Sequence, residues 1–352
     1  MNIPTSRQAA QVSEEHVLNG LHDATPFSLQ DLIAVPQQWL FEHWVQPAIF
    51  QLGWGQGIEA AFDATEWFVW GLYEVAFMVL VLGTLERWRP LEASSDPGAV
   101  RVDRVFTLLH RLGLFPLLAF AVLVPAIDAI EAALRMHGIS RPNPDQWLPE
   151  IGHTALLSWL VYLIVFDFVD YWIHRLQHRL RWWWELHAVH HSQRQMTYWS
   201  DQRNHLLDDL LRDVLIALTA LLIGAAPSQF VAFVVFSRVL QSLQHANIRI
   251  GFGHGLDRVL VSPHFHRVHH AVGLGHEGRQ QGCNFGVLFP WWDMLFGTAR
   301  WDRGYFPTGI ADQVQGRNYG QGFWALHWKA LLRVAGREPP VGAALPAESS
   351  AR

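Results

Sequence analysis

Histidine side chains in three helical groups constrain this chain more than any other feature of its sequence. The spacing H-x-x-x-H is followed by H-x-x-H-H within residues 170–191, and H-x-x-H-H recurs within residues 262–270. The eight residues are His174, His178, His187, His190, His191, His266, His269 and His270. On an α-helix, positions three or four apart share a face. Histidine accounts for 20 of 352 residues, but the repeated order of these spacings is not expected by chance and predicts a metal site.

The donor set of this site is nitrogen and oxygen. A single cysteine, Cys283, excludes an intramolecular disulfide and a site built from several thiolates. Neutral imidazole suits iron, zinc and copper. Eight donors exceed what one ion with four to six ligands can use, so two metals are expected. Ser262 and Pro263 favour a helix start just before the third group.

Further residues are expected at or near the metals. His245 follows the last apolar region and is predicted as a ninth ligand. Asp170, one turn before His174, is the first candidate for a carboxylate that orients a metal-bound histidine. Weaker candidates for that role or for a supporting one are Asp167, Asp208, Asp293, His205 and His264. Five further histidines have no companion at helical spacing and are expected to be structural: His110, His153, His254, His276 and His327.

Composition indicates a membrane protein. Half of the residues are hydrophobic, 16% are charged, and there are 18 Trp and 21 Phe. A net charge of −5 gives no reason to expect nucleic acid as a partner. Four apolar regions are long enough to consider as spans: Trp67–Leu85, Leu112–Ile130, His153–Ile173 and Leu210–Gln241.

The fourth region is interrupted at Gly224–Pro227, which predicts two helices of about a dozen residues each. A hairpin that returns to the same side is expected, with a single kinked crossing as the alternative. Arginine counts orient the spans, since residues 86–111 hold five, residues 131–152 two and residues 174–212 six. By the positive-inside rule the histidine groups face the cytoplasm, which places the protein in a membrane such as the bacterial inner membrane.

The predicted fold is therefore an all-α integral membrane protein. It has about four transmembrane segments and a cytoplasmic, histidine-rich helical cap that holds two metals. The expected divisions are a polar tail at residues 1–38, an interfacial helix and two spans at 39–152, and the catalytic domain at 153–303. The last division, 304–352, holds an amphipathic helix at Gly322–Val334 and a disordered tail of about fifteen residues.

Metal identity follows from the chemistry that the site would perform. Zinc would suit hydrolysis, but zinc hydrolases usually combine carboxylates with fewer imidazoles. Iron suits the oxidation of an unactivated C–H bond by dioxygen, and a site at the membrane surface has access to lipid chains. Iron is therefore favoured, with zinc as a replacement.

The motifs resemble those of the fatty acid hydroxylase superfamily, also called the sterol desaturase family of integral membrane di-iron oxygenases. The resemblance rests on D-Y-W-I-H-R-L-Q-H, L-H-A-V-H-H-S, H-A-N-I, S-P-H-F-H-R-V-H-H and N-F-G followed by W-W-D-M-L-F-G-T, over about Ser158–Thr298. It implies O₂-dependent hydroxylation or desaturation of a lipid, with the eight histidines as ligands and His245 in the family's H-A-N position. Asn284, in N-F-G, is a tentative supporting residue.

The resemblance also implies a separate electron donor, a ferredoxin or a cytochrome b5-like protein with its reductase. It does not specify the lipid, the carbon attacked or the oligomeric state. Three other readings stay open: a membrane zinc hydrolase, a non-catalytic metal-binding or transport protein, and a haem protein. A haem protein would place histidines in the middle of opposing spans, whereas these lie at span ends.

Overall fold

The computed structural model describes residues 31–93, 96–139, 154–225, 227–276 and 281–338. In this part of the chain the regular structure is helical, and β-pairing is limited to the isolated bridges Pro90↔Ile248 and Ala271↔Thr308. The all-helical expectation is met for these residues. The chain divides into two compact units, residues 1–69 and residues 70–352.

The first unit contains short helices. They are α2 (Asp31–Leu40), the π-helical η1 (Phe41–Val45), α3 (Gln46–Gln51), η2 (Gly55–Gly57) and the start of α4 (Ile58–Phe77). Gln37 Nε2 donates to the carbonyl of Phe62 at 3.0 Å, and the Phe41 and Phe62 rings meet edge to face. The polar tail expected up to residue 38 thus already includes helix from Asp31; residues 1–30 lie outside the described residues.

The second unit holds the rest of the helices. They are the remainder of α4, η3 (Met78–Leu82), α5 (Gly83–Trp88), α6 (Pro97–Arg111), α7 (Leu114–Met136), α10 (Ala155–Arg179), α11 (Arg181–His191), α12 (Leu206–Ile223), α13 (Pro227–His245), α14 (Gly253–Leu256), α15 (Pro263–His269), α16 (Trp291–Phe296), α17 (Ala311–Val314) and α18 (Phe323–Val334). Helix α18 matches the amphipathic helix expected at Gly322–Val334. The predicted terminal tail lies outside the described residues beyond 338.

Two helices among the described residues are long and apolar enough to cross a membrane. They are the continuous helical run Gly55–Trp88 and helix α10, Ala155–Arg179. The first extends twelve residues before the predicted span Trp67–Leu85, and the second begins two residues after the predicted start of His153–Ile173 and ends six residues beyond it. The remaining expected span, Leu112–Ile130, falls on α7.

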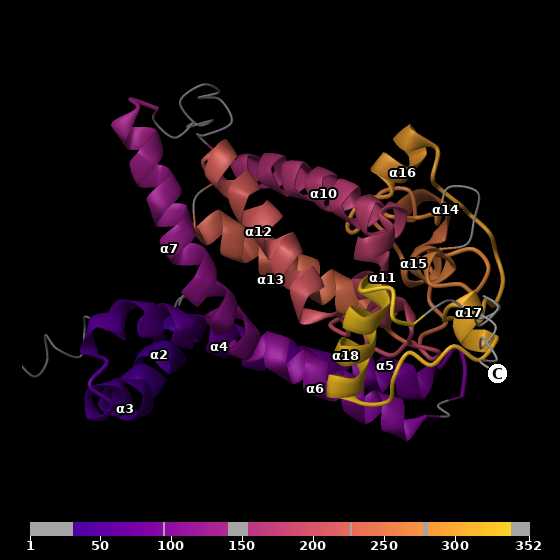
Figure 1. Cartoon of the computed structure of the whole chain (residues 1–352), viewed down its shortest axis with the longest axis horizontal. Coiled ribbons are helices and arrows are strands. Elements are labelled where there is room, and N and C mark those ends of the chain that lie inside the picture. The colour runs from indigo at the N-terminus through magenta and orange to yellow at the C-terminus, as the bar shows by residue number, and fades with distance from the viewer. Residues whose placement is uncertain (1–30, 94–95, 140–153, 226, 277–280, 339–352) are drawn as a thin grey trace, which may run out of the picture. The chain divides into compact units, whose positions relative to one another are not determined.

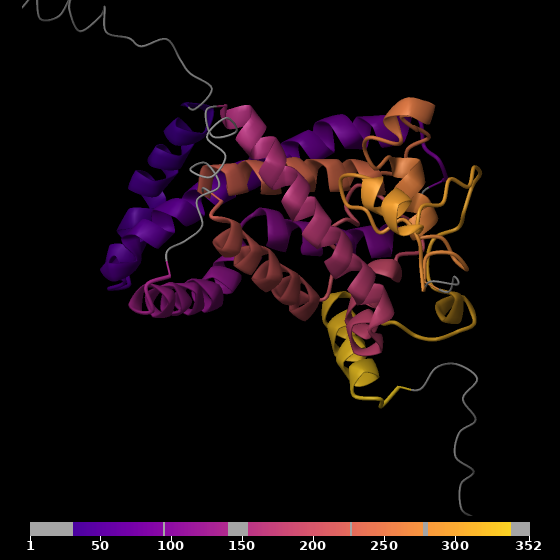
Figure 2. The same cartoon turned by 90° about the horizontal axis from the view of Figure 1, so that it is seen from above.

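Helices α12 and α13 form a hairpin against α10. At one end, Gln229 Nε2 in α13 donates to Ser158 Oγ in α10 at 3.0 Å. At the other end, Gln177 in α10 donates to Asp208 in the first turn of α12 at 2.7 Å. Helix α12 therefore runs away from α11, and after the hairpin turn α13 runs back in the same direction as α10, toward α15 (Figure 1); the second view shows these helices from above (Figure 2).

The two hairpin helices are longer than the expected dozen residues, with 18 in α12 and 19 in α13. At 1.5 Å per residue each is about 27 Å long, close to the thickness of a hydrocarbon core. The helix is longer than expected at its start because Asp208, in the first turn of α12, packs on α10 through Gln177 instead of preceding the helix.

An ion network buried within the second unit ties its helices together. Arg111, at the end of α6, donates to Glu74 in α4 and to Asp201, both at 2.6 Å, and to Ser242 in α13 at 2.8 Å. Close approach is possible because residue 71 is glycine: a Cβ there would lie 1.6 Å from the carbonyl oxygen of Arg111. Breaking one partner of such a buried pair costs about 3–5 kcal/mol, so this network holds the helix ends in register.

Candidate metal centre

Four helices bring the predicted histidines to one end of the second unit. The last two turns of α10 carry His174 and His178. Leu180 is extended, with φ −88° and ψ 114°, and this break turns the chain into α11, which carries His187, His190 and His191. His245 is the last residue of α13.

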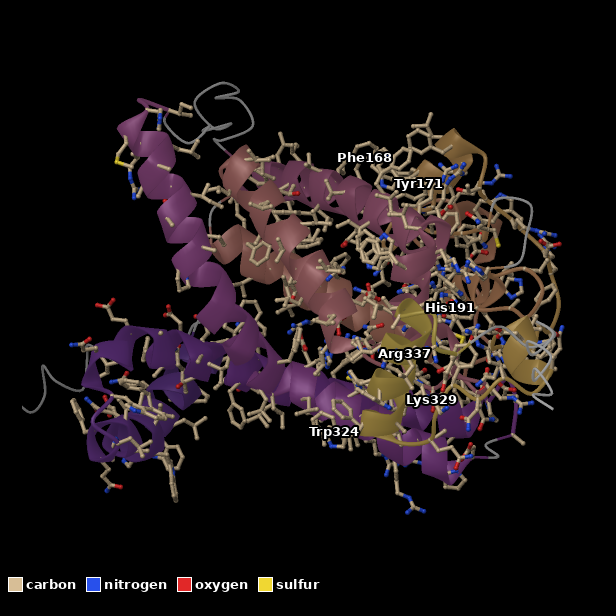
Figure 3. The ribbon with its side chains drawn as sticks, in the orientation of Figure 1. Phe168, Tyr171, His191, Trp324, Lys329 and Arg337 are labelled. Carbon is tan, nitrogen blue, oxygen red and sulfur yellow. The ribbon has the colours of Figure 1, made fainter. Side chains whose placement is uncertain are left out.

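Helix α15 supplies the remaining three. Ser262 Oγ accepts from the backbone N–H of Phe265 at 3.3 Å and Pro263 occupies the first turn, so the helix begins as its sequence predicts. His266 and His269 lie on this helix and His270 follows directly. Figure 3 shows His191 among the nitrogen atoms crowded at the ends of α10, α11 and α15.

The nine histidines lie in two groups. The five-histidine group is His174, His178, His187, His191 and His269, and the four-histidine group is His190, His245, His266 and His270. Within each group the nitrogens that face one another all lie within 4.8 Å, and every side chain is buried. The groups adjoin, since the rings of His191 and His270 stack with centroids 4.4 Å apart. Either group has the size and donor type to hold one metal ion.

Each H-x-x-H-H motif contributes to both groups. The first and last histidines of a motif, four residues apart, point into the same group: His187 and His191 into one, His266 and His270 into the other. The middle histidine points into the opposite group. Side chains four positions apart on a helix point in directions that differ by about 40°. The middle histidine, three positions after the first, points about 60° away from the first in the opposite sense. One short motif therefore connects two centres.

Hydrogen bonds fix the ring orientation in the five-histidine group. The Nδ1 atom of His174 bonds to the carbonyl of Phe285 at 2.8 Å, that of His187 to Asp208 at 2.9 Å, and that of His269 to the carbonyl of Cys283 at 2.7 Å. Donation from Nδ1 leaves the Nε2 lone pair free, and Nε2 of His187 and His269 has no hydrogen-bond partner among the described residues. These Nε2 atoms are therefore available to a metal.

In the four-histidine group the Nε2 atoms converge directly. His245 Nε2 lies 3.2 Å from that of His190 and 3.2 Å from that of His266, and His266 and His270 are 3.1 Å apart at the same atoms. His245 Nδ1 donates to the carbonyl of Gln241 at 2.9 Å. Three or four lone pairs aimed at one point repel unless a cation lies between them, so this geometry fits a bound metal.

Burial keeps these imidazoles neutral. Removal from water, reinforced by neighbouring imidazoles, holds the pKa of His190, His191, His266 and His270 well below the usual value, and burial lowers the pKa of His269 to about 3. A neutral imidazole is the form that binds metal. Burial also raises the pKa of the Cys283 thiol to about 12, so this residue is not available as a thiolate.

The expected carboxylate partner is replaced by another. Asp170 accepts both Nε and Nη2 of Arg212, at 2.9 and 2.7 Å, and it is an ion-pair partner rather than a histidine's acceptor. Asp208, a weaker candidate from sequence, orients His187 and also accepts from Gln177 and Trp183. Spacing along the chain favours Asp170, one turn before His174, whereas Asp208 reaches the site because the first turn of α12 packs on α10 and α11.

Three other candidates hold the loop that follows α15. Asp293 accepts the backbone N–H groups of Phe285 and Gly286, at 2.8 and 2.7 Å, and Asp167 accepts those of Leu288 and Phe289. Asn284, in the left-handed region at φ 55°, donates to the carbonyl of Phe265. This loop presents the carbonyls that orient His174 and His269.

Two candidates lie apart from both groups. His205 Nδ1 accepts from the backbone N–H of Leu207 at 3.1 Å, which caps α12, and its ring packs on His327. His264 contacts the carbonyl of Asp302 at 2.7 Å. His110 pairs with Asp209 at 2.8 Å. Conversely, His276 was expected to be structural, yet its ring stacks on Trp184 at 3.6 Å and lies 5.9 Å from that of His178.

Comparison with known proteins gives a family for this part of the chain. A model of the fatty acid hydroxylase family, described as "Fatty acid hydroxylase", matches residues 159–298, which contain all nine histidines. The ornithine lipid hydroxylase OlsE of Rhizobium tropici is 28% identical over 256 residues, 72% of this chain and 73% of the relative. No solved structure matches the chain.

Two other relatives are covered in part. The alkylglycerol monooxygenase of Caenorhabditis elegans is 29% identical over 53% of this chain and 36% of the relative. The Delta(7)-sterol 5(6)-desaturase ERG3B of Gibberella zeae is 27% identical over 50% of this chain and 53% of the relative. Residues 159–298 therefore match the fatty acid hydroxylase family that the histidine motifs predicted.

Proposed function

We propose that this chain is an O₂-dependent membrane oxidoreductase that hydroxylates or desaturates a C–H bond of a lipid. One observation carries the proposal: two adjacent, buried groups of imidazoles lie inside the segment that matches the fatty acid hydroxylase family. The relatives named as a lipid hydroxylase, a monooxygenase and a sterol desaturase support the same class of reaction.

The five-histidine group and the four-histidine group would each hold one metal. We propose iron in both, with zinc as a replacement when iron is scarce. Iron bound there would supply the redox chemistry that dioxygen needs to oxidise an unactivated C–H bond. An all-imidazole set favours a redox metal over a hydrolytic zinc site, which usually includes carboxylate and an open position.

The protein's own groups prepare this site. Donation from Nδ1 to Phe285, Asp208 and Cys283 holds three rings in one tautomer, so their Nε2 atoms need no rearrangement to bind. Burial of all nine histidines keeps bulk water away, which protects a reactive centre from side reactions.

We further propose that α7 and the α12–α13 hairpin join the two candidate spans as membrane segments, giving about four in all. The histidine groups lie at the C-terminal ends of α10 and α13, and six arginines lie within residues 174–212. By the positive-inside rule this end faces the cytoplasm, as expected for an enzyme of the bacterial inner membrane. There a separate electron donor, a ferredoxin or a cytochrome b5-like protein with its reductase, would reduce the site.

Lipid analysis of cells that express the chain tests the proposal. Cells grown under ¹⁸O₂ should accumulate a lipid that carries one ¹⁸O atom, or one that has lost two hydrogens, and cells that express His191→Ala should not. The first product identifies a hydroxylase and the second a desaturase. If purified protein instead holds zinc and releases hydrolysed lipid without consuming O₂, the oxidoreductase proposal is wrong.

A further inference from the structure

A pocket of about 440 Å³ lies beside the four-histidine group, and its lining has two kinds of wall. One wall is aliphatic, formed by Leu91, Met196, Ala246, Ile248 and Ile250. The other carries three arginines, Arg249, Arg267 and Arg303, together with His264 and a single carboxylate, Asp257. Because three guanidinium groups face one carboxylate, the polar wall favours an anion.

The three arginines differ in burial. The buried Arg267 is paired with Glu92 at 2.6 Å, which fixes its position, and the same carboxylate accepts from the hydroxyl of Tyr305. Arg249 and Arg303 are exposed at the rim. Guanidinium groups bind phosphate and carboxylate through paired hydrogen bonds.

The pocket lies just past the ends of two long helices. The helical run Gly55–Trp88 ends three residues before Leu91, and α13 ends one residue before Ala246. The two chain segments are joined by the bridge Pro90↔Ile248 and by hydrogen bonds between Glu92 and Asn247. Trp88, at the end of the run, is 72% exposed, as expected of an aromatic residue in the headgroup region of a bilayer.

The lining is also continuous with the candidate metal centre. Gln244 and Ala246 flank His245 in the chain, and His264 and Arg267 lie within two residues of His266. Neighbouring positions on a helix differ by about 100° in direction. The same helical turns therefore present histidines to the four-histidine group and pocket residues to an adjoining face.

We propose that this pocket binds the anionic polar head, phosphate or carboxylate, of the lipid on which the chain acts. Arg249, Arg267 and Arg303 would bind the oxyanion while the aliphatic wall receives the first carbons of the attached chain. The inference rests on the proposed function for calling this lipid the substrate, but the binding site itself is independent of turnover. It predicts selection by head-group charge.

Titration calorimetry on the purified full chain in neutral detergent tests this site without requiring catalysis. The probes are dihexanoyl phosphatidate, dihexanoylglycerol as its neutral counterpart, and inorganic phosphate. Phosphatidate should bind at least about tenfold more tightly than either of the others, since two or more charge-assisted hydrogen bonds add to aliphatic contact.

The double variant Arg249→Gln/Arg303→Gln should weaken phosphatidate binding by about tenfold or more and leave metal content unchanged. Arg181→Gln is the matched control, because Arg181 is exposed at the start of α11 and does not line the pocket. Equal binding of phosphatidate by the double variant and the unmodified chain would overturn the proposal, and phosphate binding as tightly as phosphatidate would point to a soluble anion instead.

Failure of this test leaves the metal and ¹⁸O₂ experiments untouched. A chain that binds phosphatidate as predicted but consumes no O₂ would reject only the proposed function.

Discussion

The two histidine groups differ in how firmly they are held. In the five-histidine group three Nδ1 atoms are fixed by Phe285, Asp208 and Cys283, and one of these acceptors is a carboxylate. In the four-histidine group only His245 has such a bond, while Nδ1 of His190, His266 and His270 has no hydrogen-bond partner among the described residues. Since partners of this kind orient a ligand and raise its basicity, the five-histidine group is better prepared for metal.

This difference suggests a division of labour. A centre with five imidazoles, three of them oriented by hydrogen bonds, has few positions left for an outside ligand, whereas four less constrained imidazoles leave room for one. The pocket with the arginine-rich wall also adjoins the four-histidine group. We expect the five-histidine centre to hold its metal more tightly and the four-histidine centre to be more accessible to substrate and O₂.

The largest effect should come from removing one histidine of the weaker group. His190→Ala should abolish turnover and lower the metal content from two ions to one per chain, because three imidazoles, of which only His245 has an orienting partner, hold a metal poorly. Inductively coupled plasma mass spectrometry of the purified variant measures this directly.

The matched change is His191→Ala, the next residue, which belongs to the other group. It should also abolish turnover, but the four remaining histidines of its group should retain more metal than His190→Ala does. Complete loss of both metals from either variant would mean that the groups form one inseparable centre, against the comparison drawn here.

Loss of the carboxylate should weaken one group alone. Asp208→Asn is expected to reduce metal affinity of the five-histidine group by about 10- to 100-fold, the usual effect of removing a histidine's carboxylate partner, and to leave the four-histidine group near its original affinity. Competition with a chelator, followed by metal analysis, measures both.

Asp209→Asn is the control for this change, since Asp209 is the next residue and pairs with His110 outside both groups. If Asp209→Asn lowered metal affinity as much as Asp208→Asn, the effect would reflect general loosening of α12 rather than orientation of His187.

A smaller effect is expected at His276, which packs on the five-histidine group through Trp184. His276→Ala should lower metal affinity by less than about tenfold, because it removes a stacked ring beside His178. His276→Phe keeps a stacked ring without nitrogen and should restore most of that affinity. Loss of one metal per chain in His276→Phe would instead identify His276 as a ligand.

The smallest effect on the metals should follow a change at His205. His205→Ala removes the cap of α12 and should lower the free energy of unfolding by about 1 kcal/mol, with both metals retained. His205→Asn, a good capping residue, should recover most of that stability in thermal unfolding experiments. A metal content that falls in His205→Asn would show that this residue supports the site directly.

Helical periodicity accounts for what could be predicted from the sequence. The offsets of three and four in H-x-x-H-H predicted helices with clustered imidazoles, and in the structure helices α10, α11 and α15 carry these histidines. The split of each motif between two groups was not predicted, because it depends on which neighbouring helix faces the middle residue. Because α13 packs beside α15, His266 lies against His245 in the four-histidine group, whereas His269 on the same helix points into the five-histidine group.

Contacts between distant segments account for what was missed. Asp208 is 21 residues from His187, and the two meet because the first turn of α12 packs on α10 and α11. Spacing favours Asp170, but both of its carboxylate oxygens accept hydrogen bonds from Arg212 in α12. His276 reaches Trp184 through a loop with no periodicity, so no sequence pattern indicated it.

Metal analysis of the full chain, purified in detergent and loaded with ferrous iron, tests the central claim most directly when combined with Mössbauer spectroscopy. Two iron atoms per chain, no haem absorbance and two quadrupole doublets, one from each unequal group, are the predicted result. A single iron per chain, or one zinc that ferrous iron cannot displace, would contradict the proposal that the two histidine groups form a paired iron centre.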